Sequence, residues 1–399
     1  MFLLSFFLKK LIRNGTLHII DARGKKHSFT GSAAPEVTIR FHTKLVPLQI
    51  FLKPDLKAGE AYMDGTLTVE DGKSIFDFLN LILKNMEWRP DNAMHLTGGD
   101  PYSRLKSWLA QINPARRSQQ NVAHHYDLSG DLYDLFLDKD RQYSCGYYKS
   151  KNDTLEQAQE NKKNIVAAKL LLEEHHKVLD IGCGWGGLAL HLNRLSGAHV
   201  TGVTLSQEQY DVARQRVQDN DVTDRIDIRF QDYRDIDQKF DRIVSVGMFE
   251  HVGRRQYKTY FDKIYNSLKD DGVALIHTIG RADGPGSTDP WTLKYIFPGG
   301  YAPSLSEVAP IIEKAGLYIT DMEIWRLHYA ETLKEWRVRV HKNKAAIIDL
   351  YDERFFRMWD FYLASGEASF RHMGHVVFQF QLAKKVDAVP LTRDYLFQE

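Results

Sequence analysis

A glycine-rich stretch near the middle of the chain constrains the fold more than any other feature of the sequence. The apolar run from Val178 to Ile181 ends in Gly182-Cys-Gly-Trp-Gly-Gly187, and a helical pattern begins at Leu188. This order predicts a strand, a tight turn and a helix start, which is where an α/β sheet receives a nucleotide-like ligand. Glycine suits such a turn because it adopts positive φ and lets a ligand approach the backbone.

The spacing of the glycines separates several ligand classes. It is neither the Gly-x-Gly-x-x-Gly of dinucleotide sites nor a P-loop, which ends in Gly-Lys-Ser/Thr. The pattern Asp-x-Gly-x-Gly that starts at Asp180 instead indicates S-adenosylmethionine (SAM). We therefore expect the methionine part of SAM beside Asp180 and the glycines of this loop, which are Gly182, Gly184, Gly186 and Gly187.

The length of 399 residues exceeds that of a typical single domain, so at least two hydrophobic cores are expected. We predict a small α+β domain over 1–90, a linker rich in Gly, Pro and polar residues over 91–120, and a catalytic domain over 121–399. The net charge of +1 argues against a nucleic-acid partner. Cys145 and Cys183 cannot form a disulfide framework and lack metal-site spacing, so we expect no metal and a reducing, cytoplasmic setting.

Strand and helix patterns alternate through the predicted catalytic domain. Strands are predicted near 177–181, 198–203, 226–230, 241–246, 272–277, 317–325 and 375–383, and helices near 186–196, 207–219, 257–268 and 304–315. The alternation predicts a Rossmann-like α/β fold of the class I SAM-dependent methyltransferase type, with a mainly parallel seven-stranded sheet. The last strand alternates polar and apolar residues, which indicates an edge or antiparallel strand.

The first thirteen residues combine bulky apolar side chains with basic ones. Lys9 and Lys10 follow the apolar run, whereas a signal peptide carries its charge before it. No segment approaches the roughly 20 apolar residues of a membrane span. We predict an amphipathic helix that either packs on its own domain or lies in a membrane interface. The rest of 1–90 offers no catalytic pair, and it could bind an apolar ligand or serve as a structural cap.

Two further SAM contacts are expected at the ends of the next two strands. An acidic residue normally bonds the ribose hydroxyls after the first of these strands, but this sequence has Thr204-Leu205 and no acid. Thr204 or Gln209 is expected to serve instead, and Leu205 between them is also expected to contact the cofactor. After the third strand, Gln231 and Asp232 place a carboxylate where it could accept from the adenine amino group. Asp232 alone could be a solvated loop acid. The order of these sites at successive strand ends makes the SAM prediction strong.

Two residues at the ends of later strands are candidates for the reaction centre. Glu250 follows the apolar strand that ends near Val246, and His277 ends the next strand, so both are expected at the edge of the sheet that holds the cofactor. Glu250 could instead cap the following helix, although Gly253 and Arg254 intervene before that helix begins. A single histidine is more often structural than catalytic, but its place beside Glu250 favours a catalytic role.

The motifs together resemble a known family. The segments are 178–187, Gly247-Met-Phe-Glu-His-Val-Gly253, His277-Thr-Ile-Gly280, Gln142-Tyr-Ser-Cys-Gly-Tyr147 and Tyr329-Ala-Glu-Thr-Leu-Lys-Glu-Trp336. They are similar to the cyclopropane fatty acid synthases, a family that includes the mycolic acid cyclopropane synthases and methyltransferases. The resemblance is close over about 120–385. It is looser over the amino-terminal domain, where phospholipid-acting members carry a small lipid-binding domain.

The resemblance implies cyclopropane-fatty-acyl-phospholipid synthase activity. In this reaction the cis double bond of an acyl chain in a membrane phospholipid attacks the methyl group of SAM. A base then deprotonates the resulting carbocation and the ring closes. In the family the base is a bound bicarbonate. The positions that match its cradle are Cys145, Glu250, His277, Ile279 (through its backbone) and Tyr329, while Tyr143 and Ser144 match residues that close over the SAM carboxylate.

The resemblance also suggests a homodimer that associates peripherally with the inner leaflet of the inner membrane from the cytoplasm. Tyr147, Tyr148, Tyr295, Phe297 and Tyr301 are aromatic candidates for an acyl tunnel or for plain core packing. A fatty-acyl methyltransferase that forms a methyl-branched or methylene product is the alternative enzyme, and a lipid-binding protein with an inactive SAM fold is the alternative from another class.

Overall fold

The computed structural model describes residues 1–32, 34–86 and 129–396, so the predicted linker at 91–120 lies outside the described residues. Contacts divide the chain into two compact units that are each assembled from separate stretches. The first holds the described residues up to 86 together with 288–298 and 330–375, and the second holds 129–287, 299–329 and 376–396. The contacts therefore group 288–298 and 330–375 with the amino-terminal residues, and not with the catalytic domain predicted over 121–399.

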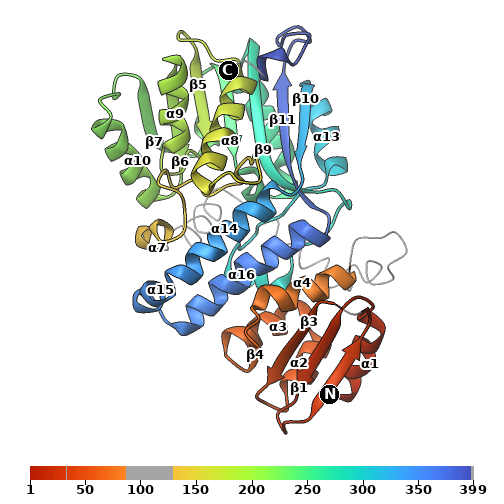
Figure 1. Cartoon of the computed structure of the whole chain (residues 1–399). Coiled ribbons are helices and arrows are strands. Elements are labelled where there is room, and N and C mark those ends of the chain that lie inside the picture. Colours follow the sequence, from red (N-terminus) through yellow and green to blue (C-terminus); the bar gives the residue numbers. More distant parts are fainter. Residues whose placement is uncertain (33, 87–128, 397–399) are drawn as a thin grey trace. The chain divides into compact units, whose positions relative to one another are not determined.

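The first unit contains a four-stranded sheet of order β2-β1-β3-β4, in which β1 runs parallel to β3 and the other neighbours are antiparallel (Figure 1). Its strands are β1 (Thr16–Ile20), β2 (Lys26–Thr30), β3 (Glu36–Phe41) and β4 (Leu67–Val69). Its helices are α1 (Phe2–Leu11), α2 (Val46–Leu52), α3 (Pro54–Met63), α4 (Ile75–Met86), α12 (Pro290–Tyr295), most of α14 (His328–Lys342), α15 (Lys344–Leu350) and α16 (Glu353–His372).

The core of this unit explains why late segments join early ones. Leu17 and Ile19 of β1 are buried in one cluster with Trp291 of α12 and Phe361 of α16. Gly59 of α3 allows the close approach, because a Cβ there would lie 2.5 Å from the indole Nε1 of Trp291. The sheet is small, and burying its apolar face requires these helices from the carboxyl-terminal half.

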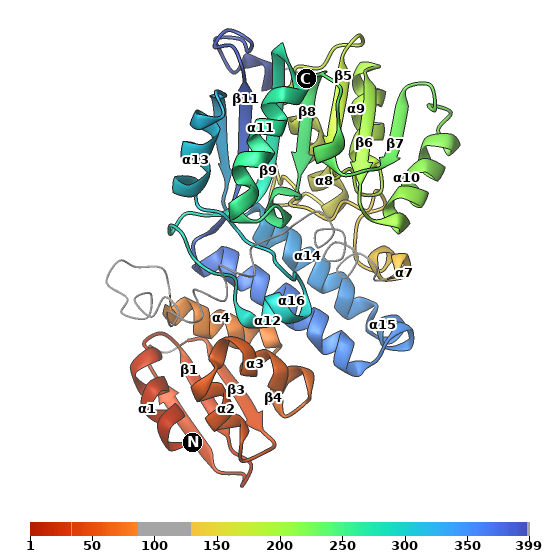
Figure 2. The same cartoon turned by 180° about the vertical axis from the view of Figure 1, so that it is seen from behind.

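The second unit contains seven strands in the order β10-β11-β9-β8-β5-β6-β7 (Figures 1 and 2). The strands are β5 (Lys177–Ile181), β6 (His199–Thr204), β7 (Ile226–Phe230), β8 (Phe240–Val246), β9 (Leu268–Arg281), β10 (Tyr318–Trp325) and β11 (His375–Ala383). The pairs from β7 through β9 are parallel, and β10 with β11 is antiparallel. The predicted mainly parallel seven-stranded sheet is confirmed. The strand at 375–383 was predicted to be an edge or antiparallel strand, and it is antiparallel to β10. It is not an edge strand, because it lies between β9 and β10.

Alternate residues of the central strands point to opposite faces of this sheet. Leu179 and Ile243 pack with α11 (Tyr257–Ser267) and α13 (Leu305–Lys314) on one face. Val178 and Val244 pack with α8 (Leu155–Leu170), α9 (Gly187–Ser196) and α10 (Gln207–Asp219) on the other. A sheet covered by helices on both faces needs apolar residues at consecutive positions, as these strands have. The functional groups therefore lie at the strand ends. The remaining short elements are α7 (Gly130–Asp134), η1 (Tyr233–Asp235), η2 (Phe249–His251), η3 (Arg254–Gln256) and η4 (Asp394–Leu396).

Candidate active site

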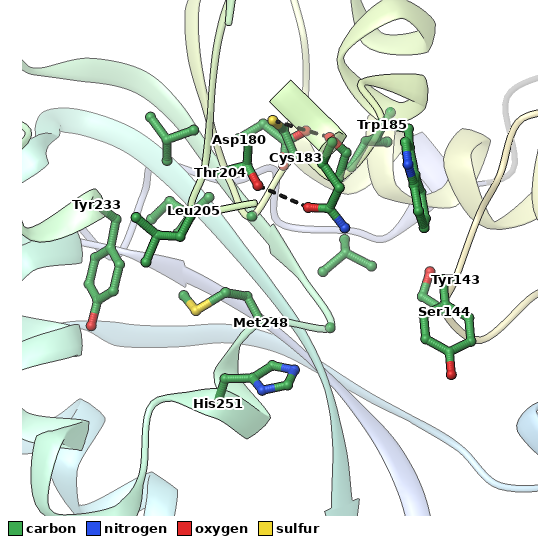
Figure 3. Close-up of a pocket in the computed structure, with 18 of the residues that line it drawn as sticks. Tyr143, Ser144, Asp180, Cys183, Trp185, Thr204, Leu205, Tyr233, Met248 and His251 are labelled. Carbon is green, nitrogen blue, oxygen red and sulfur yellow. Dashed lines mark hydrogen bonds between the residues drawn. The ribbon is translucent and has the colours of Figure 1, made fainter. Parts of the chain in front are cut away.

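A cavity lies at the carboxyl ends of β5, β6, β7 and β8 within the second unit. The chain runs outward from β5 to β6 and β7, and then returns to the other side of β5 at β8. Ligands of open α/β sheets bind where the strand order reverses in this way. Figure 3 shows Tyr233 on one side of the cavity and Tyr143 with Ser144 on the opposite side, with Asp180 and Thr204 between them.

Ten of the twelve residues predicted to bind SAM line this cavity, namely Tyr143, Ser144, Asp180, Gly182, Gly184, Thr204, Leu205, Gln209, Gln231 and Asp232. Gly186 and Gly187 do not line it. A Cβ on Gly186 would lie 3.1 Å from the Cβ of Ala213 in α10, and one on Gly187 would lie 2.6 Å from the side-chain amide of Gln142. These two glycines therefore allow neighbouring segments to pack closely around the start of α9.

Gly184 has the opposite surroundings. Its φ is +55°, and a Cβ built on it would meet no described atom within 4 Å, although the residue lines the cavity. The space beside its backbone is thus part of the cavity, as a loop that lets a ligand approach the main chain requires.

Asp180 is the buried acid of the cavity. Its side chain is 1% exposed, and its Oδ2 has no hydrogen-bond donor among the described residues. Burial raises the pKa of Asp180 to about 7, and the positive charge of Lys162 partly opposes the rise. An ammonium group in the cavity would supply a donor and stabilise the ionised carboxylate. The amino group of SAM is such a group, so this acid fits the predicted ligand.

A polar face of α8 holds the loop that carries Tyr143 and Ser144. Gln159 donates to the backbone oxygen of Ser144 over 2.9 Å, and the Nζ of Lys162 donates to Ser144 Oγ over 2.9 Å. Lys162 also donates to the side-chain oxygen of Gln142. Burial lowers the pKa of Lys162 to about 8, so it is mostly protonated at neutral pH. A carboxylate bound near Ser144 would be stabilised by this positive charge.

Thr204 and Gln209 form a pair where an acidic residue was expected. Thr204 Oγ1 donates to Gln209 Oε1 over 2.9 Å and accepts from the backbone N–H of Ser206 over 3.2 Å. The first bond orients the buried amide of Gln209 so that its N–H groups are left for a ligand. A ribose hydroxyl can accept as well as donate, so this pair can replace the missing carboxylate.

Asp232 is held by its neighbour at the far side of the cavity. Arg234 donates to its two carboxylate oxygens over 2.9 and 2.6 Å, and the backbone N–H of Arg234 adds a third bond of 3.0 Å. Oδ1 accepts two of these bonds and Oδ2 only one, so an adenine amino group could still donate to the second lone pair of Oδ2. Gln231 beside it donates to the backbone oxygen of Asp235 over 3.2 Å.

Glu250 lies in η2, directly after β8. Its Oε1 accepts from the backbone N–H of Ile279 over 2.6 Å, and within the described parts of the chain its buried Oε2 has no partner. Burial raises the pKa of Glu250 to about 7, against the opposing effect of the Ile279 N–H. Glu250 caps neither following helix, because Gly253 and Gln256 occupy those N-cap positions. Its carboxyl group instead reaches toward β9.

His277 is the buried histidine at the end of β9, and its hydrogen bonds define its tautomer. Gln379 of β11 accepts from Lys169 Nζ at its Oε1 over 2.8 Å, which turns its amide Nε2 toward His277 Nδ1 at 3.0 Å. Nδ1 therefore accepts, and Nε2 carries the proton of the neutral ring. Burial and the charges of Lys162 and Lys169 hold the pKa of His277 well below its ordinary value. The ring is thus a neutral Nε2–H donor.

The predicted catalytic residues Cys145, Glu250, His277, Ile279 and Tyr329 lie outside the lining of the cavity. The structure joins Glu250 to Ile279 directly, and Ile279 is two residues from His277 on β9. Cys145 is fully buried and Tyr329 is 8% exposed.

A set of ring contacts connects these strands to the segments of the other two candidates. Trp325 lies edge-on to His277 at 5.1 Å and contacts Tyr147 at 4.8 Å, and Tyr147 stacks on His328 at 4.5 Å. Tyr147 is two residues from Cys145, and His328 precedes Tyr329. All five candidates therefore belong to segments in mutual contact within the second unit.

Several residues of the site were not predicted from the sequence, although Arg141, Trp185, Met248, His251 and Gln256 line the cavity. Trp185, Met248 and His251 stand within the motif segments that carry the resemblance, and Arg141 directly precedes one of them. Lys162, Lys169 and Gln379 lie outside the lining of the cavity. Lys162 donates to Ser144, and Lys169 bonds to Gln379, which in turn bonds to His277. The signal for Gln379 was the polar alternation of its strand. We interpreted that pattern as an edge or antiparallel strand and assigned no role to its glutamines, whereas Gln379 and Gln381 are both fully buried.

The strand order and the position of the cavity together define a class I SAM-dependent methyltransferase. A family model described as mycolic acid cyclopropane synthetase matches residues 113–380. The chain is 38% identical to cyclopropane-fatty-acyl-phospholipid synthase of Escherichia coli K12 over 339 residues, which cover 85% of this chain and 86% of the relative. The chain therefore belongs to the cyclopropane fatty acid synthase family, as the motifs indicated.

Two other similarities describe the range of this family. A probable fatty acid methyltransferase of Pseudomonas putida is 40% identical over 265 residues, which cover 63% of this chain and 67% of that protein. A solved structure of mycolic acid cyclopropane synthase CmaA1 complexed with SAH and CTAB has a TM-score of 0.64 at 31% identity, and the match covers 68% of this chain and 99% of that one. The protein is thus a SAM-dependent enzyme of a family that contains cyclopropane synthases and fatty acid methyltransferases.

Proposed function

We propose that the protein transfers a methylene group from SAM to the cis double bond of unsaturated acyl chains in membrane phospholipids and forms a cyclopropane ring. The observation that carries this proposal is the pair of buried groups beside the SAM cavity. Glu250 has one unpaired carboxylate oxygen, and the neutral His277 offers an oriented Nε2–H. The similarity to the E. coli phospholipid enzyme supports the choice of substrate.

SAM would supply an electrophilic methyl group on its sulfonium centre. In this proposal Asp180 binds its amino group, Ser144 with the charge of Lys162 behind it stabilises its carboxylate, and the Gln209 amide donates to the ribose. The glycine loop leaves room for the chain of the ligand beside Gly184. Their shared task is to fix the methyl group in one position, because an alkene is a weak nucleophile that reacts only when it is well placed.

A bound bicarbonate would accept the proton that leaves the new methyl group before the ring closes. The residues fit such an anion in a specific way. The backbone N–H of Ile279 already donates to Glu250. The backbone of Ile279 would therefore contact the bicarbonate through its carbonyl oxygen, which would accept from the bicarbonate O–H. His277 would donate from Nε2. Glu250 has a pKa near 7, so it can be protonated beside an anion and avoid repulsion between like charges.

Cys145 and Tyr329 would complete the wall of this anion site, and the rings around them would exclude water. The contacts among Trp325, Tyr147 and His328 form an aromatic layer between the segments of these two residues. A carbocation on the acyl chain must be shielded from water until it loses its proton. Aromatic faces stabilise a nearby cation and cannot add to it as water would.

Incubation of the full chain with methyl-labelled SAM and vesicles of an unsaturated phospholipid tests this proposal. Cyclopropanation adds one labelled methylene group to the lipid, because the transferred methyl group loses one proton, and it removes the olefinic proton signals. Label in the lipid without loss of the double bond, or with a methyl branch, would contradict ring formation. That outcome would favour the fatty-acyl methyltransferase alternative, which the Pseudomonas relative supports. Absence of labelled lipid would favour a lipid-binding protein.

The phospholipid substrate also implies where the enzyme works. Within the described residues no helix is long and apolar enough to cross a membrane. We propose a cytoplasmic homodimer that associates peripherally with the inner leaflet of the inner membrane. Light scattering of the purified chain would give its oligomeric state, and a monomer at working concentration would contradict the dimer.

A further inference from the structure

We propose that one surface of the first unit, formed by α1 and α2, docks on an anionic lipid bilayer. This surface, called the α1–α2 face below, consists of Phe2, Leu3, Phe6, Leu45, Leu48 and Leu52. The proposal rests on the proposed function only for the identity of the lipid as substrate. It adds the element through which the protein would reach that lipid.

Helix α1 carries apolar residues on two stripes, and only one of these stripes packs into the core of its unit. Leu4, Leu8 and Leu11 point inward and are buried. Phe2 is 86% exposed and Phe6 is 60% exposed on the other stripe. A surface helix of a globular protein normally presents polar residues to solvent. Packing on its own domain therefore accounts for half of this helix, and the second apolar stripe lacks an explanation within the unit.

Helix α2 presents a similar stripe next to α1. Leu45, Leu48 and Leu52 recur at the spacing of one helical face, and Leu45 and Leu52 are 64% and 65% exposed. The two helices pack against each other, as Figure 2 shows. Of the 17 large apolar residues that are exposed among the described residues, seven fall within the first 52 positions. Scattered apolar residues are normal on a surface, whereas such a cluster marks a binding face.

The charge around this cluster indicates the chemistry of its partner. Residues 1–20 and 37–54 contain six Lys and Arg and no Asp or Glu, although the whole chain has a net charge of only +1. Lys9, Lys10, Lys44 and Lys53 are exposed beside the apolar residues. Apolar side chains that insert into acyl chains, together with lysines that face anionic head groups, are the features of an interfacial membrane contact.

The same charge argues against a second copy of this chain as the partner. A two-fold contact through the α1–α2 face would bring two identical sets of lysines together. Like charges across an interface oppose association. A bilayer that contains phosphatidylglycerol offers an apolar interior for the exposed apolar side chains of this face and negative charge for its lysines.

Vesicle flotation of the full chain tests the proposal. The probe is vesicles of phosphatidylethanolamine and phosphatidylglycerol with unsaturated chains, compared with vesicles of phosphatidylcholine alone. The test variant is Phe6→Glu with Leu48→Glu. The control is Leu195→Glu with Leu350→Glu, which makes the same changes of charge at exposed apolar residues of α9 and α15. Thermal unfolding checks that both variants fold.

The test variant is expected to lose vesicle binding by about tenfold for each apolar side chain kept out of the lipid, or about 100-fold in total. The control is expected to bind like the wild-type protein, and added salt is expected to weaken wild-type binding. Equal binding by test and control variants would overturn the proposal, as would a test variant that changes oligomeric state but still binds vesicles. Equal wild-type binding to both vesicle types would refute the role of the lysines.

Activity on an unsaturated phospholipid dispersed in detergent separates this proposal from the proposed function. The test variant is expected to retain its activity there, because detergent delivers the substrate without a bilayer. A wild-type protein that binds vesicles through the α1–α2 face but makes no cyclopropane product would refute the proposed function alone.

Discussion

Replacing Gln379 with glutamate is expected to move the proton of His277 from Nε2 to Nδ1. In the wild-type protein the amide of Gln379 donates to Nδ1 and accepts from Lys169. A carboxylate at position 379 keeps the contact with Lys169 as an ion pair, but it has no proton to donate. Nδ1 must then carry the proton in order to bond to it. Nε2 becomes an acceptor and can no longer donate to an anion.

The expected loss of turnover follows from the loss of the hydrogen bond that His277 Nε2 donates to the anion. A hydrogen bond to a charged group contributes about 1.5–3 kcal/mol. A factor of ten in rate corresponds to about 1.4 kcal/mol, so turnover should fall roughly 10- to 100-fold. The apparent affinity for SAM should hardly change, because neither Gln379 nor His277 lines the SAM cavity. The variant should also fold, since the new carboxylate at position 379 keeps the bond from Lys169 Nζ, whose positive charge compensates it.

The variant should recover part of this activity in acid. In the wild-type protein the pKa of His277 lies well below its ordinary value, so the ring stays neutral through the usual assay range. A carboxylate at position 379 raises that pKa. Below the raised pKa the imidazolium carries a proton on both nitrogens and can donate again. The ratio of variant to wild-type turnover should therefore increase as the pH falls, and this ratio cancels the titration of groups that the two proteins share.

Nitrogen NMR of protein labelled with ¹⁵N-histidine distinguishes the two neutral tautomers and the imidazolium without an activity assay. Gln381→Glu is the matched control. Gln381 is equally buried on β11 and donates to the backbone oxygen of Lys169 over 2.7 Å, and its partners do not include His277. The control should keep the Nε2–H form. A folded Gln379→Glu protein that still shows Nε2–H at neutral pH would refute the reasoning, as would an equal loss of turnover in both variants.

Three further outcomes test the site. Glu250→Gln should lower turnover by about 100-fold or more but change the affinity for SAH little, and an equal loss of both would identify Glu250 as a cofactor ligand. SAH should bind more tightly as the pH rises from about 5 to 7, by up to about tenfold per unit, because a bound ammonium lowers the pKa of Asp180 and releases its proton. Calorimetry in two buffers measures that proton, and Asp180→Asn should abolish its release. Gly184→Ala and Gly24→Ala should each lower the free energy of unfolding by about 1 kcal/mol, since both glycines have positive φ in open surroundings. Only Gly184→Ala should weaken SAH binding, and an equal weakening by Gly24→Ala would contradict a cavity beside Gly184.

Periodicity and strand-end motifs were enough to predict the seven strands of the second unit and ten of the residues that line the cavity. Apolar runs must be strands or helices, and parallel strands deliver their carboxyl ends to one edge. For β11 the same reasoning could not choose between an edge strand and an antiparallel strand, and the structure has an antiparallel strand inside the sheet. Its alternating glutamines resemble a solvent-facing pattern, but Gln379 and Gln381 are buried and both bond to Lys169. A pattern of polarity cannot distinguish a residue that meets water from one that meets a buried partner.

The division of the chain into its two units could not be predicted from local sequence patterns either. Segments 288–298 and 330–375 follow the first five strands of the large sheet, and nothing in their own sequence marks them as part of the amino-terminal unit. They join it because the small sheet has an apolar face that Trp291 and Phe361 help to cover. Such contacts depend on three-dimensional complementarity, which local sequence does not encode.

The glycine loop shows which properties the sequence predicts and which ones depend on tertiary structure. The sequence alone predicted that Asp180 and the following glycines form a SAM loop, because that spacing is a local property of the backbone. Tertiary structure alone decided what each residue does: Gly184 opens onto the cavity, Gly186 and Gly187 serve close packing, and Asp180 keeps an unpaired oxygen with a pKa near 7. The protonation of Asp180 and the tautomer of His277 depend on Lys162, Lys169 and Gln379, which come from distant segments of the chain. Burial and charge act through space, and only the fold determines which groups are near.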